Sequence, residues 1–289
     1  MIPGTFDYHA PATVDEAIRL LGELGDEAKL LAGGHSLLPM MKLRFASPKH
    51  LIDLNRIGAL KGIREQSGMI HIGAMTTENE LIASALLREK CPLLPEAAKW
   101  ISDPQVRNCG TLGGDIAHGD PGNDHPAVMM AVDAVFVLQG PRGERLIVAD
   151  RFFHGLYYTE LAPDEILTEI RIPAVSKGTG YAYCKLKRKT GDFATAAAAV
   201  QLRLDGGVCK KINIALTNVA PTALKAGDAE MSLTGKVIDE ALIEQAARKA
   251  MAVCDPAEDQ RGNRDYKTHM AGEMTRRAIR QALARAKGN

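Results

Sequence analysis

The spacing of apolar residues near the N-terminus predicts one amphipathic helix, followed by buried strands. The apolar positions with helical spacing are Val14, Ala17, Ile18, Leu21 and Leu24. Thr13 and Glu16 form a capping-box signature, and Gly25 is placed to end the helix. Apolar runs at 28–32 and 50–54 predict two short strands. The start of the chain therefore predicts a small βαβ-like unit.

The middle of the chain predicts an alternation of strands and helices. Its predicted strands span 62–64, 69–73, 134–138, 152–157 and 166–172. Its predicted helices span 77–89, 93–101 and 126–133. Asp124 is placed to cap the last helix, with Pro126 in its first turn. Pro173 ends this part, and 174–180 is a predicted linker.

Beyond the linker the pattern changes to consecutive strands. Strands are predicted at 181–187, 193–204 and 209–219, with Asp205-Gly206-Gly207 as a hairpin turn between the last two. Two helices are predicted at 239–253 and 265–287. The chain therefore predicts an α+β fold, and its 289 residues are enough for about two domains.

Composition and charge favour a globular protein without a nucleic-acid partner or a membrane-spanning segment. Hydrophobic residues make up 46% of the chain and charged residues 25%, and the formal net charge is +1. No apolar stretch approaches the ~20 residues that span a bilayer. The N-terminus lacks the basic and apolar regions of a Sec signal peptide, so we expect a cytoplasmic protein.

The cysteines and histidines give no sign of a metal centre in this chain. The cysteines are Cys91, Cys109, Cys184, Cys209 and Cys254. Their odd number and scattered positions argue against a disulfide framework, and iron–sulfur motifs bunch their thiolates. The histidines show no HExxH or similar ligand spacing. We therefore expect no metal site, and any metal centre that the chain works with should belong to a partner.

The first candidate site directly follows the predicted strand at 28–32. It consists of Ala32, Gly33, Gly34, His35, Ser36 and Leu37. Adjacent glycines allow positive φ and let a ligand approach the backbone closely. Successive N–H groups in such a turn can bind an anion, and Ser36 adds a hydroxyl. The alternative interpretation is a tight turn without a ligand.

The second candidate site has a similar arrangement of residues. It consists of Thr111, Leu112, Gly113, Gly114 and Asp115. Further along, Asp124 is either only a helix cap or a carboxylate that accepts a hydrogen bond from a sugar hydroxyl. Two such glycine pairs can clamp one long bisphosphate ligand from two sides. Neither offers a nucleophile with a base, and hydrolase and kinase signatures are absent, so we nominate no catalytic residue.

These segments resemble the flavoprotein subunits of the molybdenum hydroxylases, the xanthine dehydrogenase family. AGGHSLLP at 32–39 is similar to their first FAD-pyrophosphate loop, and NCGTLGGDIAHGDPGNDHPA at 108–127 to their second. The stretch 183–194 resembles the strand that opens their C-terminal domain. Length and the start MIPGTFDYH are especially similar to the medium subunits of aerobic carbon monoxide dehydrogenases.

The resemblance implies both a fold and a cofactor site. It implies a vanillyl-alcohol-oxidase (PCMH)-type FAD-binding domain at 1–176, in subdomains of about 1–55 and 56–176. A C-terminal domain at 177–289, with a three-stranded antiparallel sheet and helices, would follow. The two glycine segments would hold the FAD pyrophosphate, and Asp124 would contact the sugar chain. Leu167, Lys185 and Phe193 would lie near the isoalloxazine ring, although Leu167 also fits a core strand residue.

The function implied is electron transfer within a larger enzyme. A large molybdenum-cofactor subunit would oxidise the substrate, and a small subunit would relay electrons through [2Fe-2S] clusters. This chain would carry FAD non-covalently and pass the electrons to a quinone or another acceptor. Alone it would not act on the substrate. Family members imply a dimer of heterotrimers, in the cytoplasm or at the inner face of the cytoplasmic membrane.

Four alternatives remain open at this point. The first is a subunit of a xanthine, nicotinate or aromatic-CoA hydroxylase, because the FAD loops do not select the substrate. The second is a stand-alone flavoprotein oxidase, and the third is a nucleotide-binding module without redox chemistry. Finally, His35 follows paired glycines, where some covalent flavoproteins attach their flavin.

Overall fold

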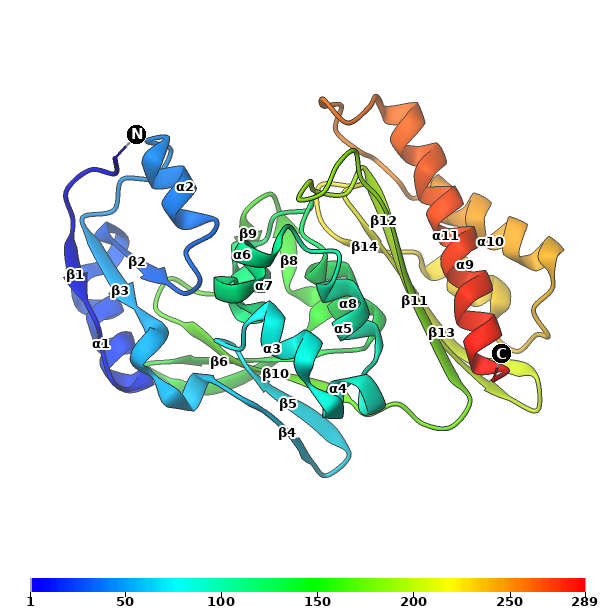
Figure 1. Ribbon diagram of the computed structural model, residues 1–289, viewed down its shortest axis with the longest axis horizontal. Coiled ribbons are helices and arrows are strands. Elements are labelled where there is room, and N and C mark those ends of the chain that lie inside the picture. The colour runs from blue at the N-terminus through cyan, green and yellow to red at the C-terminus, as the bar shows by residue number, and fades with distance from the viewer. Residues whose placement is uncertain (1, 289) are drawn as a thin grey trace.

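A three-stranded parallel sheet forms the N-terminal part of the computed structural model, which describes residues 2–288. The strand order is β1, β3, β2, and this unit lies at the left of Figure 1. Its elements are β1 Asp7–His9, α1 Val14–Leu24, β2 Ala28–Leu31, α2 Leu37–Lys42 and β3 His50–Asp53. The predicted helix and both strands are confirmed, while β1 was not predicted.

Local sequence explains both ends of α1. The Thr13 hydroxyl accepts a hydrogen bond from the Glu16 N–H (3.2 Å), which caps the helix. The Glu16 carboxylate binds the N–H of Ala12 rather than that of Thr13, so the capping box is displaced by one residue. Gly25 ends the helix at φ +53°, a left-handed conformation that favours glycine.

A five-stranded antiparallel sheet lies at the centre of residues 2–288, in the order β4, β5, β10, β6, β7. Its strands are β4 Ile63–Gln66, β5 Met69–Gly73, β6 Val135–Gly140, β7 Gly143–Val148 and β10 Ile166–Pro173. A small hairpin of β8 Phe153–Gly155 and β9 Tyr158–Thr159 lies between β7 and β10 in the chain. Apart from β7 and β9, these strands match predicted segments.

Short helices cover this central sheet (Figure 1). They are α3 Glu78–Ala83, α4 Ala85–Lys90, α5 Leu93–Ala98, α6 Pro104–Cys109, α7 Leu112–His118 and α8 His125–Ala131. The prediction of one helix at 77–89 is wrong. Ser84 adopts an extended conformation, and its hydroxyl accepts from the N–H of Leu87, so it begins a second helix.

The C-terminal part forms a sheet between two layers of helices. Its strands are β11 Thr179–Leu186, β12 Ala196–Asp205, β13 Val208–Thr217 and β14 Leu224–Lys225. The three long strands are those predicted, and the two-residue β14 extends the sheet at one edge. Its helices are α9 Gly227–Leu233, α10 Glu240–Ala252 and α11 Arg264–Ala286. Both predicted helices are confirmed, and α9 is additional.

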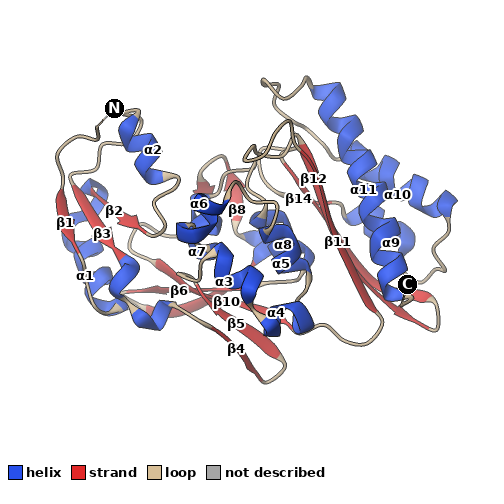
Figure 2. Cartoon of the chain, in the orientation of Figure 1, coloured by secondary structure: helices blue, strands red, loops and turns tan. Residues whose placement is uncertain are grey.

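Small residues allow this sheet to be covered on both faces. Figure 2 shows α10 and α11 on one side of β11–β13, and α5 and α8 on the other. The run Ala196–Ala199 is fully buried, and its residues alternate between the two hydrophobic cores. A Cβ at Gly180 would lie 1.9 Å from the Ala282 carbonyl oxygen, so only glycine lets α11 approach β11 this closely.

Residues 2–288 contain neither a candidate membrane-spanning helix nor a candidate metal site. Within this range, no helix combines the length and hydropathy that crossing a membrane requires. Nor do its His, Cys, Asp and Glu side chains form a group of three or more suited to hold a metal ion.

Candidate functional site

The first glycine segment links β2 to α2 and exposes a run of backbone donors. Gly34 has φ +75°, in the left-handed region. None of the N–H groups of Gly33, Gly34, His35 and Ser36 donates to a backbone carbonyl within residues 2–288. His35 and Ser36 are exposed. Successive unengaged N–H groups around such a turn form a concave site for an anion.

The second glycine segment is built differently from the first, and the expectation of a matching turn is wrong. Thr111 caps α7, so Gly113 and Gly114 lie in the first turn of a helix. Their N–H groups are engaged, Gly113 by the Ala74 carbonyl (2.8 Å) and Gly114 by the Thr111 hydroxyl (3.2 Å). This segment can therefore offer side chains and a surface to a ligand, but not those two N–H groups.

The two segments nevertheless lie against each other, as the sequence predicted for a clamp. A Cβ on Gly33 would lie 2.3 Å from the Cys109 carbonyl oxygen, so the backbones touch there. A Cβ on Gly114 would lie 3.4 Å from the Ala32 Cβ. Gly113 is likewise pressed onto Ala74, at the end of β5. The glycines of both segments thus permit close packing between them and the central sheet.

A buried cluster of ionisable side chains lies behind the second segment. His125 pairs with Glu78 (Nε2 to Oε2, 2.8 Å), and both side chains are almost fully buried. Burial alone would lower the pKa of His125, but the charge and hydrogen bond of Glu78 raise it to about 9. Burial raises the pKa of Asp115 to about 7. Asp115 Oδ2 and His125 Nδ1 are buried without a hydrogen-bond partner among residues 2–288.

Asp124 connects this cluster to the C-terminal sheet. It occupies the position before α8, but its side chain makes no capping hydrogen bond, so its interpretation as a helix cap is wrong. Its Oδ2 accepts from Lys185 Nζ at 2.6 Å, and its Oδ1 accepts from the Tyr183 hydroxyl. Both partners are buried on β11, where a lysine charge or a tyrosine hydroxyl without a partner would be costly.

The last two predicted residues occupy different environments. Leu167 is 4% exposed in β10 and belongs to the central hydrophobic core. Phe193 is 45% exposed and lies in the loop between β11 and β12. A Cβ at Gly122 would lie 3.3 Å from its ring, so Phe193 covers the turn just before Asp124. The structure thus brings Phe193, Lys185 and Asp124 to one region and places Leu167 in the core.

Comparison with known families agrees with this geometry. Residues 4–175 match the model of the FAD binding domain in molybdopterin dehydrogenase. Residues 181–282 match the model of the CO dehydrogenase flavoprotein C-terminal domain. The chain belongs to the flavoprotein subunits of the molybdopterin dehydrogenases.

Individual relatives within this family are similar over their full length. The carbon monoxide dehydrogenase medium chain of Hydrogenophaga pseudoflava is 60% identical, with 99% of both chains covered. The corresponding chain of Afipia carboxidovorans is 51% identical, covering 99% of this chain and 100% of that one. A solved structure of the H. pseudoflava enzyme, which lacks the Mo-pyranopterin moiety, matches with a TM-score of 0.98 at 62% identity and covers 99% of both chains.

The residues present fit the FAD that this family binds. The first segment offers unengaged N–H groups of the kind that hold a pyrophosphate. Asp115, in the second segment, would repel phosphate if ionised, but burial raises its pKa to about 7, so about half of these carboxyls are neutral at pH 7. The buried unpartnered atoms Asp115 Oδ2 and His125 Nδ1 are further polar groups that a ligand or water can satisfy.

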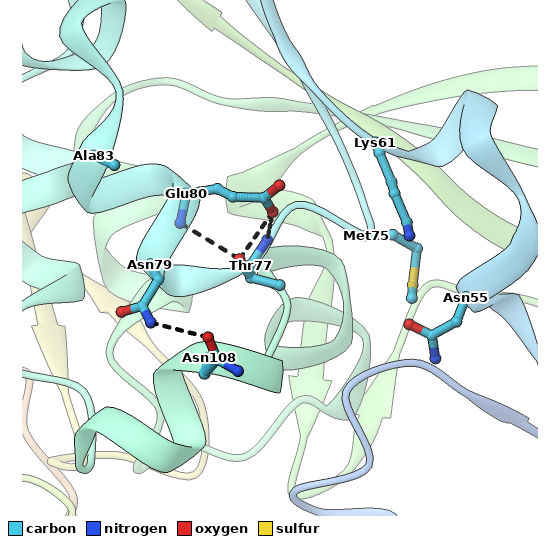
Figure 3. A pocket seen from close by; sticks show the side chains of 8 residues that line it. All are labelled: Asn55, Lys61, Met75, Thr77, Asn79, Glu80, Ala83 and Asn108. Atoms are coloured by element: carbon cyan, nitrogen blue, oxygen red, sulfur yellow. Dashed lines mark hydrogen bonds between the residues drawn. The ribbon is translucent and has the colours of Figure 1, made fainter.

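A polar cleft next to the first segment contains residues that the sequence did not single out. Its volume is about 420 Å³, and it is lined by Asn55, Lys61, Met75, Thr77, Asn79, Glu80, Ala83 and Asn108. Figure 3 shows Asn79 facing Asn108 on one side, with Asn55, Lys61 and Met75 on the other. Asn55 donates to the Ala32 carbonyl oxygen (3.2 Å), which joins the cleft to the segment. Asn108 belongs to the recognised motif, but isolated Asn55 and Lys61 carried no signal.

Proposed function

We propose that this chain is the FAD-carrying electron-transfer subunit of an aerobic carbon monoxide dehydrogenase. The single observation that carries the proposal is 60% identity over essentially the whole chain to a carbon monoxide dehydrogenase medium chain. The overall reaction would be CO + H₂O → CO₂ + 2 H⁺ + 2 e⁻. When bound, FAD supplies the redox chemistry that takes up these electrons and passes them on.

The chain itself would bind and orient the cofactor. Ala32 to Leu37 would hold the pyrophosphate through backbone N–H groups and the Ser36 hydroxyl, without a lysine. The Thr111–Asp115 segment would close the site from the other side. Asp124 would accept from the sugar chain while keeping Lys185 and Tyr183 as partners. Lys185 and Phe193 would lie toward the isoalloxazine ring, and Leu167, which packs in the core, would reach the ring only with its 4% exposed part.

The cleft shown in Figure 3 would take the adenosine end of the cofactor. Support comes from its position, because Asn55 binds the carbonyl of Ala32, where the pyrophosphate segment begins. Its lining is rich in amide and hydroxyl groups, which suit ribose hydroxyls and ring nitrogens. Binding through such groups needs no covalent bond, and we propose that FAD is held non-covalently.

The partners would supply the remaining centres. A large subunit would hold the molybdenum cofactor and a small subunit the [2Fe-2S] clusters, in a dimer of heterotrimers. The electron acceptor would be a quinone or another carrier, and the complex would work in the cytoplasm or at the inner face of its membrane. We assign no catalytic residue to this chain, since its proposed task is to bind and position FAD.

The phosphate role of the first segment can be tested by removing one hydroxyl. Ser36 is exposed and its hydroxyl makes no capping hydrogen bond to α2, so Ser36→Ala should leave the fold unchanged. Loss of one hydrogen bond to a charged phosphate should weaken FAD binding about tenfold or more. Titration of the FAD-depleted protein with FAD, followed by flavin fluorescence, measures this.

The matched control is Ser47→Ala, because Ser47 is also an exposed loop serine but lies outside both glycine segments. Its FAD affinity should equal that of the unmodified chain. Equal affinity for all three proteins would remove Ser36 from the site. A purified chain, alone and with its partners, that never shows flavin absorbance near 450 nm would contradict the proposed function itself.

A further inference from the structure

Two loops of the C-terminal part are tied together beside the proposed flavin site. Residues 187–195 connect β11 to β12, and residues 253–263 connect α10 to α11. Asp192 lies at their contact, and its side chain is 6% exposed. It accepts from Arg188 Nε (2.8 Å) and from Arg261 Nη2 (2.6 Å) and Nε (3.2 Å). The carboxylate thus joins a loop near the site to a loop that is remote in sequence.

We call the ion pairs of Asp192 with Arg188 and Arg261 the Asp192 clamp, and both loops support it. Arg188 also donates to the Gln260 carbonyl (3.0 Å), a second link between the two loops. The 253–263 loop is anchored by Lys267 of α11, a buried side chain that donates to the Ala257 carbonyl (2.8 Å) and pairs with Asp259 (2.9 Å). Arg261 itself contacts Asp259. Bidentate, charge-assisted contacts of this kind fix geometry better than single neutral hydrogen bonds.

Phe193 is the residue that this clamp positions. It follows Asp192 directly, and the Arg261 guanidinium lies 5.6 Å from its ring centre, a cation–π contact. The ring covers Gly122, two residues before Asp124. Without these contacts, an aromatic side chain in a glycine-containing loop would be free to swing into solvent. Burial opposes ionisation of Asp192, but the two arginines lower its pKa to about 2, so the clamp stays charged at neutral pH.

We propose that Arg261 and Asp192 are positioning residues, whose ion pair holds Phe193 over the flavin side of the site and limits access from solvent. This inference rests on the proposed function, because it needs FAD beside Lys185 and Asp124. The inference goes beyond the proposed function because it assigns a role to the α10–α11 loop, which contributes no residue to the proposed FAD contacts.

The test compares Arg261→Gln with Arg264→Gln in the FAD-loaded protein, purified with any partners it retains. Arg264, at the start of α11, also pairs with a carboxylate of this loop, exposed Asp255, but within residues 2–288 its side chain has no contact with Asp192 or Phe193, so its loss is a matched control. The measurement is quenching of flavin fluorescence by acrylamide, which is uncharged and insensitive to the lost charge. Arg261→Gln should raise the quenching constant about fivefold, as expected from loss of a charge-assisted clamp, and Arg264→Gln should not.

A double-mutant comparison separates positioning from general loosening of the fold. Phe193→Ala should raise the quenching constant by itself, and adding Arg261→Gln should raise it no further. Arg261→Lys, which keeps one charged contact to Asp192, should restore part of the protection. Equal increments from Arg261→Gln with and without Phe193 would overturn the proposal.

The single tryptophan gives a readout that does not depend on flavin. Lys187, at the start of the same loop, lies 5.0 Å from the ring centre of Trp100. In the cofactor-free chain, Arg261→Gln should therefore change the emission and acrylamide quenching of Trp100, and Arg264→Gln should not. Stoichiometric FAD with unchanged quenching in Arg261→Gln overturns the clamp alone. A chain that binds no FAD overturns the proposed function and, with it, this inference.

Discussion

At the scale of single residues, the buried pair of Lys185 and Asp124 is expected to carry more stability than a surface pair of the same length. Lys185→Met leaves the Asp124 carboxylate buried and without its cation, which should cost about 3–5 kcal/mol. Lys211 pairs with Asp133 at the same distance, 2.6 Å, but is 58% exposed. Lys211→Met should therefore cost about 1 kcal/mol or less.

Urea unfolding of the two variants, followed by circular dichroism, measures this difference. The free energy of unfolding should fall clearly for Lys185→Met and hardly for Lys211→Met. Similar losses in both variants would show that burial does not distinguish the two pairs, and that the Asp124 region is more hydrated than the structure indicates.

The residues of the site could be predicted from sequence only as far as their roles are local. Paired glycines after a strand predicted an anion-binding turn, and the first segment has the left-handed Gly34 and the unengaged N–H groups that such a turn needs. The second pair looked the same, but the Ala74 carbonyl and the Thr111 hydroxyl occupy its N–H groups. Asp124 likewise looked like a cap, whereas its partners lie about 60 residues away on β11. Such long-range contacts leave no pattern in a single sequence.

At the scale of elements, the contact between α3 and α8 makes stability depend on pH. The pKa of His125 is raised from 6.5 to about 9 by Glu78, so the pair stabilises the fold fully below pH 6.5. This contribution is lost as the pH rises through about 9, because the folded state must then release its proton. The melting temperature should fall between these values.

Melting curves of His125→Gln and His269→Gln across this pH range isolate the effect. His125→Gln should have a lower melting temperature than the unmodified chain at pH 6.5. Its melting temperature should then fall much less between pH 6.5 and pH 9. His269 lies exposed on α11, and His269→Gln should keep the slope of the unmodified chain. The pair would not be the cause if His125→Gln retained the full slope.

Elements with a clear period were predicted well, and those held by tertiary contacts were not. The strands of the C-terminal sheet and helices α10 and α11 follow from their patterns. The short β1 and β14 exist because a neighbouring strand supplies their hydrogen bonds. The break between α3 and α4 depends on the Ser84 hydroxyl, which accepts a hydrogen bond from the Leu87 N–H. The spacing of apolar residues does not reveal this contact.

At the scale of the whole molecule, the proposed FAD site draws its residues from distant parts of the chain. It would combine the first glycine segment, the ion pair at Asp124 and the loop with Phe193. The proposed site therefore depends on how the parts of the chain pack together. The division at residues 176 and 177 stays a prediction. It is supported by the start of β11 at Thr179, and limited proteolysis would test it.

Because the proposed role of the chain is to carry FAD, we predict that the purified chain cannot oxidise carbon monoxide by itself. Its proposed contribution is FAD, while activation of CO and water would need the molybdenum centre of a partner. The FAD-loaded chain, freed of partners, should therefore show no CO-dependent reduction of an artificial dye. It should still pass electrons to a quinone after chemical reduction, since that step needs only the bound flavin. Adding the large and small subunits should restore CO oxidation. Turnover of CO by a preparation shown by mass spectrometry to contain neither molybdenum nor other subunits would show that the chain is a complete enzyme.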